Sequence, residues 1–86
     1  MNKNFKTIDE NELEDFINEC ESRGINPEEF QMVEHDVIET ELNAATSIVN
    51  GKVTISRGNH LTTYLTGDST DWLVSFARDL RKGVFG

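Results

Sequence analysis

One stretch constrains the fold of this chain more than any other: the run SIVNGKVTIS at residues 47–56. It is rich in β-branched residues that alternate with polar ones, which is the pattern of a half-buried strand. Asn-Gly between two such runs is typical of a two-residue type I′ turn, so the run predicts a β-hairpin that turns at Asn50-Gly51. The residues expected on its buried face are Ile48, Val53 and Ile55.

A second turn and a further strand follow this hairpin. The turn is expected at Arg57–His60 and the strand at Leu61–Thr66. An even connection places Tyr64 beside Val53 on the buried face. One bulged residue would instead turn the alternate residues of this strand inward, and the sequence leaves both alternatives open. The alternate residues are Leu61, Thr63 and Leu65.

The segment before the hairpin is either a strand or the continuation of a helix. We expect a single helical turn that begins at Asn26-Pro27, then a strand through Phe30–Val37, with residues 38–45 as a loop. The strand is preferred because an isolated two-stranded hairpin is marginal, whereas three strands backed by helices are stable.

An amphipathic helix is expected near the N-terminus. Thr7 and Glu10 predict a capping box, in which each residue satisfies a backbone N–H at the start of the helix. The apolar stripe that follows supports a helix over residues 8–23, and Gly24 is suited to end it.

A second helix is expected near the C-terminus. Its cap is Asp68, Ser69 or Thr70, and Asp71 lies in its first turn, where negative charge is favoured. Gly83 is suited to end it. The residues that recur on one face at i, i+4 and i+8 are Trp72, Phe76 and Leu80.

Together these elements predict one α+β domain, residues 1–86: an N-terminal helix, a three-stranded antiparallel meander, and a C-terminal helix packed on the sheet. Both helices are expected on one face of the sheet. A chain of this size buries only about 60–65% of its unfolded surface. Hydrophobic residues make up 36% of the chain, which is also low. A core this thin is often supplemented by self-association, so a homodimer is expected.

The net charge of −8 lies in the first half of the chain. Residues 1–43 hold thirteen Asp or Glu against three Lys or Arg, a net of −10, while residues 44–86 have a net of +2. An acidic half repels nucleic acid and anionic membranes, so neither is an expected partner. The single cysteine, the polar N-terminus and the absence of a membrane-length apolar stretch indicate a cytoplasmic protein.

The sequence offers little for catalysis. His35 and Asp36 are neighbours on the expected strand, where adjacent side chains point to opposite faces, so they are not expected to share a metal. Cys20 lies on an apolar helix stripe, where burial raises the pKa of a thiol and opposes nucleophilic chemistry. Neither a Gly-x-Ser-x-Gly elbow nor a phosphate-binding loop is present. We therefore expect neither an enzyme nor a cofactor.

Part of the C-terminal half carries a resemblance. The residues are VTIS at 53–56, YLTGDSTDW at 64–72 and FARDLRKGVFG at 76–86. They resemble the C-terminal half of small uncharacterised bacterial open reading frames of mobile elements, including integron gene cassettes. The resemblance implies a bacterial intracellular protein with a helix after a meander, and it supplies no catalytic or binding residue.

Three functions follow as hypotheses. The first is a non-catalytic protein that acts through contacts with a second copy or another protein, through an apolar patch at Trp72 and Phe85. The second is an acidic nucleic-acid mimic that inhibits a DNA- or RNA-handling enzyme, and the third is a small-ligand binder with a pocket between sheet and helices. The ordinary alternatives are a solvated helix face and plain core packing. The candidate interaction residues are Glu12, Asp15, Glu19, Tyr64, Trp72, Phe76 and Phe85.

Overall fold

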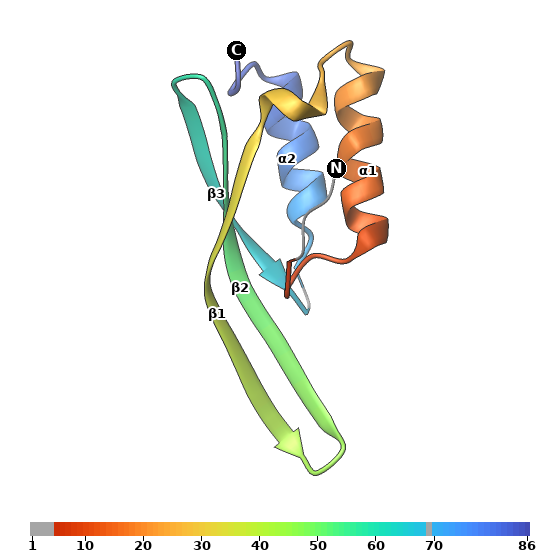
Figure 1. Cartoon of the computed structure of the whole chain (residues 1–86), viewed down its shortest axis with the longest axis vertical. Coiled ribbons are helices and arrows are strands. Elements are labelled where there is room, and N and C mark those ends of the chain that lie inside the picture. Colours follow the sequence, from red (N-terminus) through yellow and green to blue (C-terminus); the bar gives the residue numbers. More distant parts are fainter. Residues whose placement is uncertain (1–4, 69) are drawn as a thin grey trace.

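The computed structural model describes residues 5–68 and 70–86, and its elements follow the predicted order (Figure 1). β1, β2 and β3 form one antiparallel sheet in that order, and both helices lie on the same side of it. The predicted α+β fold, with a single helical turn before the first strand, is confirmed. The elements are α1 (Glu10–Ser22), the 3-10 turn η1 (Pro27–Glu29), β1 (Gln31–Asn43), β2 (Thr46–Arg57), β3 (His60–Gly67) and α2 (Trp72–Arg81).

The predicted position of the first hairpin turn is wrong. Asn50 and Gly51 lie inside β2, and the turn that joins β1 to β2 is at Ala44-Ala45. The expected loop at residues 38–45 is also wrong. β1 continues to Asn43, which pairs with Thr46, the first residue of β2. The expected buried face is therefore wrong for Ile48, which lies five residues before Val53 on one continuous strand and so on the opposite face.

Gly51 is needed for close packing rather than for a turn. A Cβ atom at this position would lie 3.1 Å from Cγ2 of Thr7 and 3.2 Å from Cγ2 of Val37. Opposite it, β1 carries an extra residue between His35 and Ile38, a β-bulge at which Asp36 adopts a φ of +53°. The Asn-Gly pair thus accommodates a bulge and the N-terminal segment, which are tertiary features.

The β1–β2 hairpin extends well past the helices (Figure 1). β3 pairs with β2 only from Asn50 to Arg57, so residues 38–49, which we call the arm, have no third strand. The molecule is accordingly 45 Å long and 21 Å across. Because a two-stranded ribbon is marginal by itself, the arm depends on the three-stranded part of the sheet for its order.

The second turn has the even connection. Val53 pairs with Tyr64, and both side chains are buried, which confirms one of the two alternatives. Leu61 and Leu65 are then directed away from the helices and are 66% and 64% exposed.

The helix ends differ in detail from the predictions. The N-cap of α1 is Asp9 rather than Thr7, and its capping box is completed by Glu12 rather than Glu10. Thr7 is instead buried in the tertiary structure. Asp71 is the N-cap of α2, without a side-chain capping hydrogen bond among the described residues, and Ser69 lies outside those residues.

The core lies between the inner face of the sheet and the two helices. The ring of Phe76 lies at its centre, 4.9 Å from the ring of Phe16 and 5.5 Å from that of Phe85, measured between centroids. The indole N–H of Trp72 donates to Glu12 at 2.8 Å and so joins α2 to α1. Cys20 is a free buried thiol whose pKa is raised by its burial to about 11. The core therefore uses most of the aromatic side chains of the chain.

Candidate interaction surface

The face of the sheet that points away from the helices, which we call the outer face, carries exposed apolar side chains. Alternation along the strands places Val33, Leu61 and Leu65 there, because their neighbours Met32 and Tyr64 are buried. Val33 is 59% exposed and Ile38, at the base of the arm, is 63% exposed. No helix covers this face in Figure 1. The outer face is therefore an apolar surface that the described part of the fold leaves to solvent.

A hydrogen-bonded network crosses the outer face. Nδ1 of His35 lies 3.3 Å from Oδ2 of Asp36, and Nε2 of the same ring lies 2.8 Å from Oγ1 of Thr54. That hydroxyl lies 2.9 Å from Oγ1 of Thr63. Nζ of Lys52 lies 3.6 Å from Oδ2 of Asp36. The network joins all three strands and places one carboxylate beside one ammonium group, so the face carries little net charge.

The convergence of His35 and Asp36 contradicts the expectation that they point to opposite faces. The reason is the bulge, since the left-handed backbone at Asp36 turns its side chain back to the side of His35. A carboxylate, an imidazole and a hydroxyl in this order also occur in nucleophilic triads, where the carboxylate is buried. Here the carboxylate side chain is 62% exposed, and the Thr54 hydroxyl is shared with Thr63. The network therefore orders the face rather than activating a nucleophile.

A shallow hollow opens at the base of the arm. It is lined mainly by apolar atoms, and Ile38 and Leu65 lie on opposite sides of Gly51 in its lining. The hollow joins the exposed part of β1 to the exposed part of β3.

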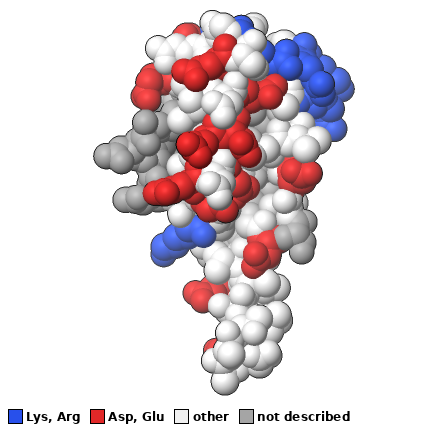
Figure 2. All heavy atoms as spheres, turned by 90° about the vertical axis from the view of Figure 1, so that its right-hand side faces the viewer, with Lys and Arg blue, Asp and Glu red and all other residues white. Residues whose placement is uncertain are grey.

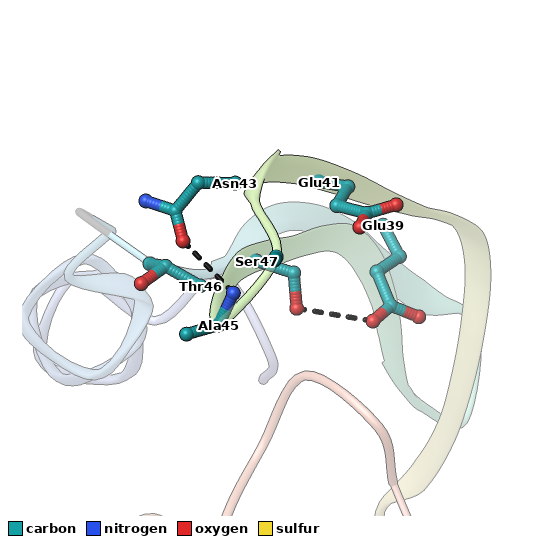
Figure 3. A pocket seen from close by; sticks show the side chains of 7 residues that line it. Glu39, Glu41, Asn43, Ala45, Thr46 and Ser47 are labelled. Atoms are coloured by element: carbon teal, nitrogen blue, oxygen red, sulfur yellow. Dashed lines mark hydrogen bonds between the residues drawn. The ribbon is translucent and has the colours of Figure 1, made fainter.

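The inner side of the arm is polar. Figure 3 shows Glu39, Glu41 and Ser47 around a hollow near the turn, and Oγ of Ser47 donates to Oε1 of Glu39 at 3.1 Å. The backbone N–H of Ala45 donates to Oδ1 of Asn43 at 2.9 Å, which orders the turn. Within residues 5–68 and 70–86, no three His, Cys, Asp or Glu side chains lie together as metal ligands. The arm thus has a polar inner side and a more apolar outer side.

On the helical side, Figure 2 shows a group of Asp and Glu side chains with a separate group of Lys and Arg side chains beside it. Of the three carboxylates predicted to act as a mimic, Glu12 is half-buried and bound to Trp72 and to the backbone of Asp9. Glu19 is half-buried and pairs with Arg23 at 3.1 Å. Asp15 is exposed, as are Glu14 and Glu10 of the same helix. Two of the three predicted residues therefore have a structural role, and the exposed carboxylates of α1 include residues other than those predicted.

The four predicted aromatic residues do not form a surface. Tyr64, Trp72, Phe76 and Phe85 are between 0% and 6% exposed, so the expected patch at Trp72 and Phe85 is absent from the described structure. The rings of Tyr64 and Trp72 each contact that of Phe76, with centroids 6.3 Å apart. Those rings fill the space in which a ligand pocket was expected. The hydroxyl of Tyr64 donates to Asp79 at 2.7 Å, and burial together with this bond raises the pKa of the phenol.

A second polar cluster anchors the N-terminal segment to the sheet. The carboxylate of Glu34 accepts from the backbone N–H groups of Lys6 and Thr7, at 2.9 and 2.8 Å. The hydroxyl of Thr7 also donates to Glu34 and lies 2.6 Å from that of Thr66. Burial raises the pKa of Glu34, but these hydrogen bonds outweigh it and lower the pKa below its usual value. Glu34 is therefore held as a carboxylate that fixes the segment before α1.

Sequence reasoning missed the outer face as a surface. The signal that would have found it is the pairing of Tyr64 with Val53, because a buried Tyr64 requires Leu61 and Leu65 to point outward. Comparison of the chain with protein-family models, with curated proteins and with solved structures finds no match. In the part of the chain that the structure describes, no helix is long and apolar enough to cross a membrane.

Proposed function

We propose that this chain is a non-catalytic bacterial protein of the cytoplasm that acts through protein–protein contacts and forms a homodimer. The observation that carries the proposal is the uncovered outer face, on which Val33, Ile38, Leu61 and Leu65 are each at least 59% exposed. Exposed apolar patches on small proteins commonly mark sites of association. The buried, reduced thiol of Cys20 supports a reducing compartment, and the resemblance noted above supports a bacterial source.

Affinity capture from a native-source lysate tests this proposal. The tagged wild-type protein is compared with the double variant Val33→Lys/Ile38→Lys, which charges the outer face. The matched control is Glu14→Lys/Asp15→Lys, which places the same new side chains on the exposed surface of α1. We expect the outer-face variant to lose at least tenfold of the specifically captured proteins of other sequence, while the control retains them. Equal capture by all three proteins would contradict the proposal.

An acidic mimic of nucleic acid is a second candidate function. It is supported by the clustering of carboxylates on the helical side in Figure 2. A basic partner held by such a surface is released by salt, because exposed charges are screened. In the same capture experiment, this function predicts loss with the α1 variant, retention with the outer-face variant, and release at high salt.

A further inference from the structure

The two free edges of the sheet are β1 and β3, and only β1 is protected by charge. β1 carries four carboxylates, from Glu34 to Glu41, and a bulge. β3 has the sequence HLTTYLTG and contains no Asp, Glu, Lys or Arg. Natural proteins protect free edges with charged side chains and bulges, since an unprotected edge pairs with other strands. In a chain with a net charge of −8, an uncharged edge is the one that a second copy can approach.

The outward-facing backbone groups of β3 follow from the turn that precedes it. Arg57 and His60 flank a two-residue turn and form a hydrogen-bonded pair, and such pairs alternate along an antiparallel ladder. The backbone N–H and C=O groups of Leu61, Thr63 and Leu65 therefore point away from β2. In residues 5–68 and 70–86, no backbone hydrogen bond to these outward groups is present.

We propose that β3 pairs with β3 of a second copy, antiparallel and centred on Thr63, so that two three-stranded sheets become one of six strands. This inference rests on the homodimer of the proposed function and specifies its interface. A two-fold axis at Thr63 sets Thr63 opposite itself and Leu61 opposite Leu65 of the second copy. All three pairs then join residues whose backbone groups face outward, and each pair exchanges two hydrogen bonds.

The side chains are complementary in the same register. On the outer face, Leu61 and Leu65 of one copy meet Leu65 and Leu61 of the other, so two apolar pairs replace side chains that are 66% and 64% exposed. No residue of β3 is charged, so the pairing in this register rests on backbone hydrogen bonds and apolar side chains.

Charge substitutions at Thr63 test the register directly. We expect wild-type protein to sediment as a dimer, because the edge is uncharged and self-complementary. Thr63→Lys and Thr63→Glu each place two like charges opposite one another at the axis, so each variant should be a monomer with an unchanged far-UV circular dichroism spectrum. An equimolar mixture of the two variants should form a heterodimer, since opposite charges then meet. The matched control is Thr40→Lys, at an exposed position on the arm of β1, which should remain a dimer.

The remaining outcomes overturn the proposal in distinguishable ways. Dimers of both single variants, with no preference for the mixture, would exclude pairing at Thr63 and leave the outer-face function to the capture experiment. A wild-type protein that sediments as a monomer at every concentration would exclude self-pairing altogether. If the monomeric variants were unfolded, the mixture would not recover a heterodimer with native circular dichroism, and the assignment of Thr63 to a free edge would be wrong.

Discussion

β1 and β3 are the two margins of one sheet, and they differ in the features that decide whether a strand edge pairs. β1 is thirteen residues long, bulged at Asp36 and lined with carboxylates, whereas β3 is eight residues long, regular and uncharged. The longer strand offers more hydrogen-bonding groups and is nevertheless the protected one. The comparison shows that the carboxylates of the sheet lie on one margin, and it is the basis for proposing that the other margin pairs.

The largest effect we expect is a difference in stability between proline substitutions at Tyr64 and at Thr63, whose backbone N–H groups point to opposite sides of β3. Tyr64→Pro removes a backbone N–H that points to β2 and disrupts a buried side chain, at a cost of about 3 kcal/mol or more. Thr63→Pro removes an outward N–H, which an edge strand tolerates, and an exposed hydroxyl that lies 2.9 Å from that of Thr54, so it should preserve the fold while abolishing the dimer. Thermal unfolding and sedimentation of the two variants measure this difference. Similar unfolding by both substitutions would show that Thr63 is not at a free edge.

The protection of β1 can be removed by Glu39→Thr/Glu41→Thr. We expect this variant to form assemblies larger than a dimer, because each like-charge pair relieved across a β1 seam is worth about 0.2–1 kcal/mol. Light scattering reports the assemblies. The control is Glu14→Thr/Asp15→Thr, which lowers the net charge equally on α1. Assembly by both variants would assign the effect to net charge and contradict edge protection.

Acid should loosen the anchoring of β1 to the N-terminal segment. The pKa of Glu34 is lowered in the folded protein, so its stabilising contribution is fully present above the ordinary carboxyl value of 4.5 and is lost as the pH falls through the lowered value. The melting temperature of wild type should therefore fall in this range more steeply than that of Glu34→Gln. Parallel curves for the two proteins would remove Glu34 from the acid response.

The smallest effect is expected for the stability of the outer-face variant. Val33→Lys/Ile38→Lys changes exposed side chains, so the free energy of unfolding should change by about 0.5 kcal/mol or less per site. Denaturant unfolding measures it. A larger loss would mean that the outer face is part of the core, and the capture experiment would then need single substitutions.

The elements set by local pattern could be predicted, and those set by tertiary contact could not. The spacing of Trp72, Phe76 and Leu80 is a local property, and all three side chains are buried as expected. Asn50-Gly51 has the local chemistry of a turn, but the bulge opposite it and the approach of Thr7 depend on residues far along the chain.

The same distinction applies to the candidate site. Aromatic side chains near the C-terminus are equally consistent with a core and with a surface until their partners are known. Phe85 is buried because it contacts Phe30, which precedes β1, with ring centroids 5.4 Å apart. Glutamate on a helix is usually solvated, so the sequence alone does not distinguish Glu12. Its structural role is to accept a hydrogen bond from Trp72, sixty residues away. The outer face became identifiable only when the register of β3 was known.

Amide hydrogen exchange along the two edge strands tests the central claim most directly. In concentrated wild-type protein, we predict that the amides of Leu61, Thr63 and Leu65 are protected, while the outward amides of β1 exchange freely. Dilution or Thr63→Lys should abolish the protection on β3 without changing the amides that bond to β2. Rapid exchange at all three positions in concentrated protein, or protection along β1 instead, would contradict the account.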